Sequence, residues 1–552
     1  MNKRTFFLFL LIAVVLCMGS FKLNFYQQLS QGDHGRDLYS AQAALRGEMP
    51  YKDYWWVYGP LMPYYFAFFY KAAGSSIVGF LVGDLVLKTA AAAFFYLACT
   101  CFIPPLLACL GALWFAQAQP DFFFTFNHQG GITAELWVIF MLFAFIKDKT
   151  PKYLWMTLPA ILIYCLIKIN FGLAALIVVI ITATLSSYNT PQGRALLKKF
   201  YPMCAFLVAA VGLIYWLLLK DLNIYEIRQC MPYFGDDQPH HFPPSLTIPY
   251  YFTQHWLTLV HAWLDLGQSL SRGTGNLFFI FLSFYSAMNC FHHVLLHAAT
   301  VLVIWLLVSR TINAEENKRL LWCLGILLTF FILNFHEFVV SGVWYRTYWS
   351  LPFLFMFHAI MIAFAYRIFP KWVRGILWSA LGSLLVLNLI VSFFTTQQQK
   401  VPANFLTSPY ANVYVGNEPE WTQTVNAVSE FLNKNLKEDE TFFALPYDDI
   451  YYYLTDKHSP SRMLIFFDHI KIAPAQEVSI IKELESKKVA YVVMSNRIIS
   501  SERGLGIFGK TYCPLIAAYI NQKFTPLVRQ GGDWNKEPGW GNNHGVLILK
   551  RK

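Results

Sequence analysis

The stretch QGDHGRDLYSAQAALRGEMPYKDYWWVYGPL (Gln31–Leu61) decides how the chain is interpreted, because it is polar yet follows a strongly apolar run. It carries four carboxylates and three cationic side chains among tyrosines, tryptophans and prolines. The preceding run, MNKRTFFLFLLIAVVLCMGSF, has a basic start and an apolar body. No A-x-A-like cleavage site follows it, so we interpret it as an uncleaved first membrane helix. The quoted stretch is then the first loop outside the membrane.

The composition supports a membrane protein. Of the 552 residues, 56% are hydrophobic and only 14% are charged, whereas a soluble domain carries about a quarter charged residues. Apolar runs of membrane length recur, which predicts a polytopic α-helical protein. The net charge of +11 indicates basic cytoplasmic loops and attraction to membrane lipids. No basic stripe with interleaved aromatic residues indicates a nucleic-acid partner.

Hydropathy predicts about eleven membrane spans, since a spanning helix needs about 20 apolar residues. Besides the first helix, the predicted spans are Ile77–Ala98, Ile103–Ala118, Gly131–Ile146, Tyr153–Ile167, Gly172–Ser186, Tyr201–Leu219, Met288–Val308, Leu320–Phe335, Ser350–Ala365 and Ile376–Phe394.

Short basic segments alternate with longer, less basic ones. The basic groups are Lys3 and Arg4; Lys147, Lys149 and Lys152; Arg194, Lys198 and Lys199; Arg310, Lys318 and Arg319; and Arg367, Lys371 and Arg374. By the positive-inside rule these lie in the cytoplasm. The protein is therefore expected in the cell membrane, inner or plasma, with its N-terminus in the cytoplasm. Because the number of spans is odd, the C-terminus is expected on the extracytoplasmic side.

Three outer pieces follow from this topology: a first loop over residues 23–76, a long loop over 220–287, and everything after about residue 395. In the last piece, EWTQTVNAVSEFLNKNL places Trp421, Val425, Val428 and Leu432 on one helical face. TFFALP, AYVVMS and GVLILK read as strands, and QEVSIIKELESKK as a helix. We predict a transmembrane domain over 1–395 and an extracytoplasmic α/β domain over 396–552.

Within the first loop, RDLYSAQAALRG predicts a short helix with Leu38, Ala41, Gln42 and Leu45 on one side and Gly47 at its end. The aromatic run YWWVYGPLMPYYFAFFY is typical of the membrane–water boundary. We therefore expect the loop to lie on the outer leaflet, with its carboxylates held beside the lipid surface.

These motifs resemble the bacterial protein-mannosyltransferase-like glycosyltransferases of the GT-C fold, a superfamily that includes the lipid A aminoarabinose transferases. The elements of the resemblance stand in order as Asp33, Tyr39, Gly47, Pro50-Tyr51-Lys52-Asp53 and Pro60-Leu61. KINFG (168–172) and HEFVVSGVWYRTYWSLP (336–352) resemble later outer-face motifs of the group, and the C-terminal EWTQTV and YYYLTDKHSPSR resemble its outer domain.

The resemblance implies transfer of a sugar from a polyprenyl-phosphate donor to a lipid, glycan or protein acceptor on the outer face. An inverting transfer needs one carboxylate to take the acceptor proton. Asp33 is the first choice for this base and Asp37 the second. Many members carry Asp-Glu at the first acidic site where this chain has Asp33-His34, so the choice between the two aspartates stays open. Helix capping is the alternative role for such a residue.

Cationic side chains are expected at the donor phosphate. Lys168 ends an apolar run and Arg346 lies among aromatic residues, so either is a candidate partner for the leaving phosphate; a snorkelling lysine and an arginine stacked on aromatics are the alternatives. His128 in NHQGG is a candidate substrate contact or a turn histidine. Asp53 and His336 belong to the motifs that carry the resemblance, which implies a place for them at the substrate.

No cofactor is predicted with certainty, and no metal ligand is assigned. A divalent metal stays open, held by Asp236, Asp237, His240 and His241 in GDDQPHH. Asp84 and Lys88 are spaced to form an ion pair on one helical face. Two other functions remain: a glycan polymerase or ligase, which the long 220–287 loop keeps open, and a secondary transporter, which the lack of internal repeats disfavours.

Overall fold

The computed structural model describes residues 2–118, 126–231, 315–341, 346, 349–368, 370–502, 504–539 and 542–552, with single positions between 247 and 264. The predicted span Met288–Val308 and the GDDQPHH segment lie outside the described residues.

Helices occupy ten of the eleven predicted span ranges. Those of the membrane part are α1 (Lys3–Ser20), α4 (Ile77–Cys99), α5 (Pro105–Ala118), α6 (Phe126–Asp148), α7 (Pro151–Ile167), α8 (Ile169–Ser187), α9 (Pro191–Leu219), α13 (Glu315–Asn334), α15 (Leu351–Ile368) and α16 (Lys371–Gln399). Among the described residues, six helical segments are long and apolar enough to cross a membrane, and the helices over 105–117 and 151–167 are shorter apolar ones. The protein is therefore a polytopic helical membrane protein.

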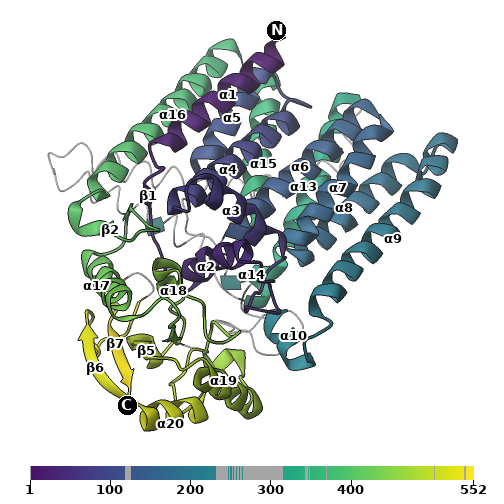
Figure 1. The fold of residues 1–552 in the computed structure, drawn as a ribbon. Helices are drawn as coiled ribbons and strands as arrows, with labels where there is room; N and C mark the ends of the chain where they lie inside the picture. Colours follow the sequence, from purple (N-terminus) through teal and green to yellow (C-terminus); the bar gives the residue numbers. More distant parts are fainter. Residues whose placement is uncertain are drawn as a thin grey trace.

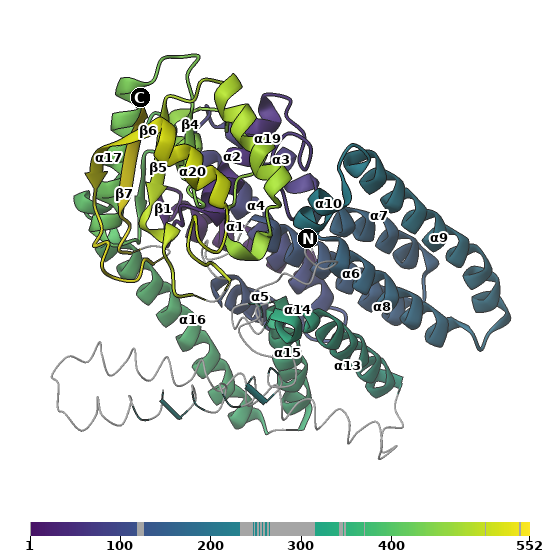
Figure 2. The same cartoon turned by 90° about the horizontal axis from the view of Figure 1, so that it is seen from below.

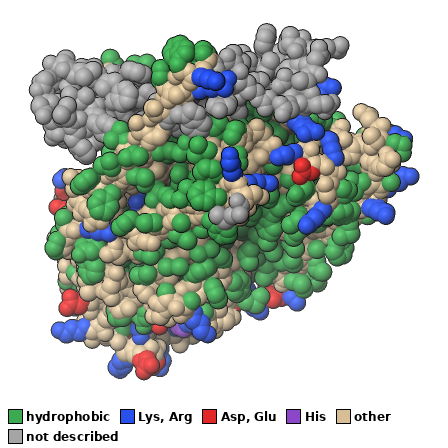
Figure 3. Space-filling view, turned by 90° about the horizontal axis from the view of Figure 1, so that it is seen from above, with side chains coloured by type: hydrophobic (Ala, Val, Ile, Leu, Met, Phe, Trp, Pro, Cys, Tyr) green, Lys and Arg blue, Asp and Glu red, His purple; other side chains and the backbone are tan. Residues whose placement is uncertain are grey.

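The bundle shows the surface of a protein embedded in lipid. Large apolar side chains are exposed along α9, among them Phe206 at 67% and Trp216 at 60%. A soluble protein rarely exposes such a continuous apolar face. Figure 3, viewed from the side of the N-terminus, shows hydrophobic side chains over most of the described surface, with Lys and Arg outnumbering acidic groups. Within α4, the predicted pair of Lys88 and Asp84 is confirmed, at 3.1 Å.

The first loop folds into two helices, α2 (Asp33–Leu45) and α3 (Leu61–Ala72), which pack on each other, and α3 also packs on α4. The predicted short helix is confirmed as α2, and Gly47 follows it with φ +86°, a conformation that glycine adopts at little cost. The expectation that the loop's aromatic run lies against lipid is wrong for Tyr54, Trp55 and Trp56, whose side chains are buried in protein. They form the core of the loop because the C-terminal segment covers it.

The segments after α16 contain the predicted alternation of strands and helices. A four-stranded sheet has the order β4-β5-β7-β6, with β4 parallel to β5 and the other pairs antiparallel. Its strands are β4 (Phe442–Leu445), β5 (Tyr491–Ser495), β6 (Phe524–Gln530) and β7 (Val546–Arg551). The helices are α17 (Pro419–Asn435), α18 (Ile450–Thr455), α19 (Pro474–Ser486) and α20 (Pro514–Lys523), with 3-10 turns at Pro402–Asn404, Asp468–Ile470 and Asn496–Ile498. The predicted apolar face of α17 is buried as expected.

The two ends of the chain also share a small sheet of order β1-β3-β2. Strand β1 (Phe25–Tyr26) runs parallel to β3 (Val413–Val415), which pairs with β2 (Phe405–Leu406). Helix α18 packs directly on α2. Figures 1 and 2 show the C-terminal strands and helices gathered on the side of the bundle where α2, α10 (Ile224–Cys230) and α14 (His336–Ser341) lie. The first loop is thus enclosed between the bundle and the C-terminal segment.

Candidate active site

The first loop builds an acidic centre at the start of α2. Arg36 donates through Nε and Nη2 to Asp37 Oδ1, at 2.9 and 2.7 Å. Its Nη1 lies 3.3 Å from Asp33 Oδ1. Burial by itself lowers the pKa of Arg36, but the neighbouring Asp37 carboxylate outweighs that effect and the pKa is raised well above its usual value. The guanidinium therefore stays charged and holds both aspartates in place.

The two aspartates differ in how much solvent reaches them. The side chain of Asp37 is 0% exposed, whereas that of Asp33 is 49% exposed. Both hydrogen-bonding partners of Asp33, Arg36 and Tyr447, are on Oδ1, with the Tyr447 hydroxyl at 2.8 Å. This leaves Asp33 Oδ2 available to a substrate. Of the two aspartates predicted as the base, Asp33 is reached by solvent and Asp37 is buried against Arg36; the choice between them stays a prediction.

Aromatic rings surround the other side of Arg36. Its Cζ lies 5.7, 5.4 and 5.1 Å from the ring centroids of Trp55, Trp56 and Tyr58. The loop is fixed there because Trp56 Nε1 donates to Gly59 O at 3.0 Å and Gly59 N donates to Ile167 O at 2.9 Å. These contacts bring the first loop against the end of α7, next to Lys168.

Lys168 lies between α7 and α8 in a second charged centre. Its Nζ is 2.5 Å from Glu337 Oε1, and both side chains are buried. Asn170 Nδ2 is 3.3 Å from the same carboxylate oxygen and 2.9 Å from His336 Nε2. His336 Nδ1 lies 2.5 Å from Leu333 O, which fits the tautomer with its proton on Nδ1. KINFG and HEFVV, which are far apart in sequence, therefore meet.

Tyr58 connects the two centres. Its ring centroid is 5.7 Å from Lys168 Nζ, and Trp349 and Phe171 offer further faces to that ammonium at 4.5 and 4.7 Å. His128 packs on Trp349, with ring centroids 4.7 Å apart. The charged groups thus lie against a row of aromatic rings, called the aromatic wall below: Trp55, Trp56, Tyr58, Phe171 and Trp349. Such rings strengthen interactions with cations and exclude water.

The structure brings most of the predicted site residues together. Asp33, Asp37, Lys168, His128 and His336 belong to the two centres, and Arg346, which is partly buried, acts electrostatically on Lys168. Asp53 stands apart: it is exposed, and its Oδ2 accepts from Met49 N at 2.7 Å to close a turn. Its role at the substrate stays a prediction.

No metal centre is found in the described part of the chain, where no three His, Cys, Asp or Glu side chains are grouped closely enough. The aspartates and histidines of GDDQPHH lie outside it.

Four residues of the site escaped the sequence analysis: Arg36, Tyr58, Glu337 and Tyr447. Arg36 and Glu337 stand beside predicted residues, in GRD and HEF. The need of Asp37 and Lys168 for an oppositely charged partner is the signal that could have identified them as candidates. Tyr447 follows β4, 414 positions after Asp33, and no sequence pattern pairs them.

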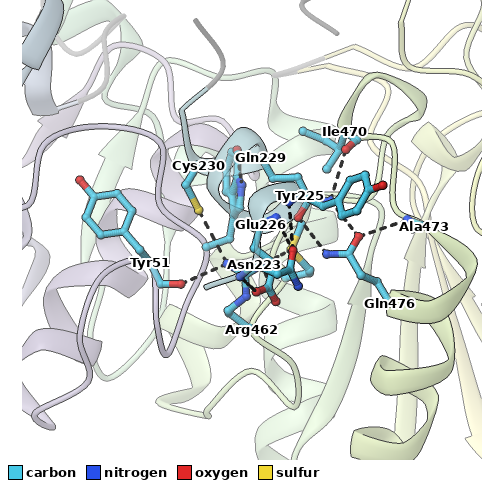
Figure 4. Close-up of polar contacts among 12 residues, drawn as sticks. Tyr51, Asn223, Tyr225, Glu226, Gln229, Cys230, Arg462, Ile470, Ala473 and Gln476 are labelled. Carbon is cyan, nitrogen blue, oxygen red and sulfur yellow. Dashed lines mark hydrogen bonds and ion pairs between the residues drawn. The ribbon is translucent and has the colours of Figure 1, made fainter. Parts of the chain in front are cut away.

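A polar junction ties the outer segments together beside this site (Figure 4). Arg462 donates to Tyr51 O at 3.1 Å and pairs with Glu226 of α10 at 3.5 Å. Its backbone oxygen accepts from Trp55 N at 2.7 Å, and Trp55 Nε1 donates to Gln229 O at 3.0 Å. The first loop, α10 and the C-terminal segment are therefore joined at Trp55, next to Arg36.

Comparison of the structure with solved proteins gives several matches of low sequence identity. The Archaeoglobus fulgidus oligosaccharyltransferase, solved with Zn and sulfate, is 12% identical with a TM-score of 0.49, covering 88% of this chain and 68% of its own. ArnT from Cupriavidus metallidurans is 12% identical in its apo state, with a TM-score of 0.46 and coverage of 99% and 98%. The same protein bound to undecaprenyl phosphate is 10% identical, with a TM-score of 0.44 and coverage of 98% and 97%.

ArnT is the lipid A aminoarabinose transferase, and both it and the oligosaccharyltransferase are members of the GT-C fold. A scan against models of known families finds no match, and no curated protein matches the sequence. Because each of these TM-scores is below 0.5, the case for function rests on the residues of the site.

Proposed function

We propose that this chain is an integral-membrane glycosyltransferase that moves a sugar from a polyprenyl-phosphate donor to an acceptor hydroxyl on the extracytoplasmic face. The observation that carries the proposal is the acidic centre, where Asp33 has one anchored oxygen and one oxygen open to a substrate. It lies on the same aromatic wall as a second, cationic centre. A base beside cations suits a reaction in which a hydroxyl loses a proton and a phosphate departs.

The reaction follows from this layout. Asp33 Oδ2 takes the proton of the acceptor hydroxyl as its oxygen attacks the anomeric carbon. The bond between that carbon and the phosphate oxygen breaks, and the polyprenyl phosphate leaves with the electron pair. Attack from the face opposite the leaving group inverts the anomeric configuration.

Arg346 and Lys168 are the proposed partners of the departing phosphate. Lys168 is already paired with Glu337, so the pair by itself has little charge left to offer, and Arg346 next to it adds a cation. A guanidinium can donate two parallel hydrogen bonds to phosphate. His128, which packs on Trp349, and His336, whose Nε2 lies 2.9 Å from Asn170 Nδ2, are the proposed contacts to the sugar.

The test is a transfer assay with the full chain in lipid nanodiscs. Undecaprenyl-phosphate-linked glucose, mannose and 4-amino-arabinose are offered as donors, with envelope lipid extract as acceptor. Mass spectrometry is expected to show one donor consumed, and NMR of the product an inverted anomeric centre. Retention of configuration would exclude the single-base mechanism. Activity that survives in both Asp33→Asn and Asp37→Asn would exclude the acidic centre as its origin.

The same proposal places the acidic centre outside the membrane. Cysteines introduced at Lys52 and at Lys536, both exposed, are expected to react with a membrane-impermeant maleimide in intact spheroplasts. A cysteine at Lys149, in a basic loop, is expected to react only after lysis. The reverse pattern would put the site in the cytoplasm, where the proposed outer-face donor is not presented.

A further inference from the structure

Asp33 receives a hydrogen bond from a residue far away in the sequence. The hydroxyl of Tyr447, just after β4, lies 2.8 Å from Asp33 Oδ1. The Tyr447 side chain is 2% exposed. Its ring is held edge-on between Trp55 and Phe467, with centroids 6.4 and 6.2 Å away. A buried ring with two aromatic neighbours holds its hydroxyl in one place, so this contact is fixed by packing.

The glycines on either side of Asp33 give independent evidence for this close approach. A Cβ on Gly32 would lie 2.5 Å from Tyr447 Cδ1, and one on Gly35 would lie 2.3 Å from Ile450 N. Ile450 N also donates to Gln31 O at 3.1 Å. Side chains are therefore absent from the start of α2 at the two places where residues 447–450 pack on it. The GDHG sequence matches a surface that the C-terminal segment supplies.

The Tyr447 hydroxyl is the donor in this contact. Burial raises the pKa of Tyr447 well above its usual value, and although Arg36 opposes the shift, the Asp33 carboxylate adds to it. The phenol therefore stays protonated across the working pH range. Besides Tyr447, the charged or titratable groups that face Asp33 are Arg36 on α2 and Asp449 on the C-terminal segment.

We infer that Tyr447 is a positioning residue for the base: together with Arg36 it holds Asp33 Oδ1, turns Oδ2 toward the acceptor and favours the ionised carboxylate. This inference rests on the proposed function for its catalytic meaning, although the contact itself can be tested without a substrate. It makes the C-terminal segment part of the active site. Removing the hydroxyl takes away a hydrogen bond that only the ionised carboxylate makes at full strength.

The test measures the protonation of Asp33 directly. A water-soluble carbodiimide with glycine ethyl ester modifies protonated carboxyl groups, and Asp33 is exposed enough to react. Peptide mass spectrometry follows its labelling rate against pH in the full chain. In Tyr447→Phe the midpoint of that profile is expected to move up by about half to one pH unit, because the charged form has lost a donor.

Tyr453→Phe is the matched control. Tyr453 is buried in α18, and its hydroxyl donates to Tyr410 O at 2.8 Å, so the variant loses one hydrogen bond without touching Asp33. Its midpoint is expected to stay in place. Gly32→Ala is a second route to the same result, because its methyl group displaces the Tyr447 ring while leaving the hydroxyl present. A midpoint unchanged in both Tyr447→Phe and Gly32→Ala would overturn the inference.

Turnover then separates this inference from the proposed function. With the donor that supports transfer, Tyr447→Phe is expected to lower kcat about tenfold and to move the acid limb of the rate profile upward in step with the labelling midpoint. If the midpoint moves but Asp33→Asn still transfers sugar, Tyr447 positions a carboxylate that is not the base, and the proposed function fails alone. If Asp33→Asn is inactive but no midpoint moves, only the role of Tyr447 fails.

Discussion

The two charged centres of this protein are built from similar parts and differ in access. In one, Arg36 binds Asp37 and Asp33, and the Asp33 side chain is 49% exposed. In the other, Lys168 and Glu337 pair at 2.5 Å with 5% and 2% of their side chains exposed. Burying an ion pair costs desolvation that its attraction only partly returns. The buried Lys168–Glu337 centre, called the sealed centre below, is therefore suited to holding the proposed phosphate partners in place, and the centre of Asp33, called the open centre, to taking a proton.

Removing Asp33, the solvent-exposed acid of the open centre, is expected to have the largest effect on activity. Asp33→Asn is expected to lower kcat by about 10²- to 10⁴-fold, because no other carboxylate has an oxygen in the same place. Its melting temperature should stay close to that of the parent, since the side chain is half exposed. Initial rates of transfer from the lipid-linked donor check the first point and differential scanning fluorimetry the second.

Asp53→Asn is the matched control for that substitution. Asp53 is an exposed acid of the same loop that closes a turn at Met49, so without the predicted role at the substrate its loss should leave the rate within about twofold, as for most surface changes. A larger loss in this variant alone would support that role. Equal losses in the two variants would show that charge in the loop matters and that the position of Asp33 does not.

Substitution in the sealed centre should mainly lower stability, whereas substitution of Asp33 should mainly lower the rate. Lys168→Met leaves Glu337 in the protein interior without its ammonium partner, and breaking a buried pair costs about 3–5 kcal/mol. The free energy of unfolding should fall by that amount, measured by denaturant titration in detergent micelles. The double variant Lys168→Met with Glu337→Gln removes both charges and should recover much of the loss. A double variant as unstable as the single one would contradict this account.

The sequence predicted the open centre better than the sealed one. Asp33 and Asp37 lie close together in a polar loop after the first helix, so the sequence alone proposes both for one site. Lys168 and Glu337 are 169 positions apart, and their pairing depends on how α8 and α13 pack. Each looks in isolation like a charge at the end of an apolar run. Periodicity therefore locates the helix ends but not the partners that meet there.

The sequence did not predict that protein encloses the first loop, and the reason is different. The aromatic run around Trp55 and Trp56 has the composition of a membrane-boundary segment, and composition cannot tell lipid from protein as the apolar neighbour. The division at residue 395 stays a prediction, and contacts such as Tyr447 with Asp33 and β1 with β3 cross it. Strand and helix patterns after residue 405 predicted the local elements because they depend on nearby residues only.

A buried acid outside the two centres sharpens the comparison, since burial outweighs the attraction of its cationic neighbour Arg497. Asp448 is fully buried, and burial raises its pKa to about 7 even though the Ser495 hydroxyl, at 2.6 Å, lowers it. In the folded state this group therefore binds its proton more tightly than the unfolded chain does. Its contribution to stability is present at low pH and is lost as the pH rises between about 4, its usual pKa, and 7.

Asp448→Asn removes that loss, because the amide cannot ionise. The stability of the variant relative to the parent should rise with pH across this window, by more than about 1 kcal/mol between pH 5 and pH 8. Chemical denaturation at a series of pH values measures the difference. His544 lies 3.8 Å from Asp448, and burial lowers its pKa to about 3, so it stays neutral over the window and does not mask the trend. A difference that is flat in pH would mean that Asp448 is ionised throughout.

The smallest effect is expected at the junction that supports the open centre from outside. Arg462→Lys keeps the charge facing Glu226 but loses the planar fork that also reaches Tyr51 O. The expected loss of stability is about 1 kcal/mol, the net worth of one hydrogen bond. Activity should change little, since the bond from Trp55 N is accepted by the backbone of residue 462 and survives the substitution. Arg529→Lys, at an exposed site where the guanidinium stacks on Trp534, is the control for losing an arginine as such. A fall in kcat with Arg462→Lys that exceeds its effect on stability would show that the junction adjusts Arg36 through Trp55, and the open centre would then depend on three outer segments instead of two.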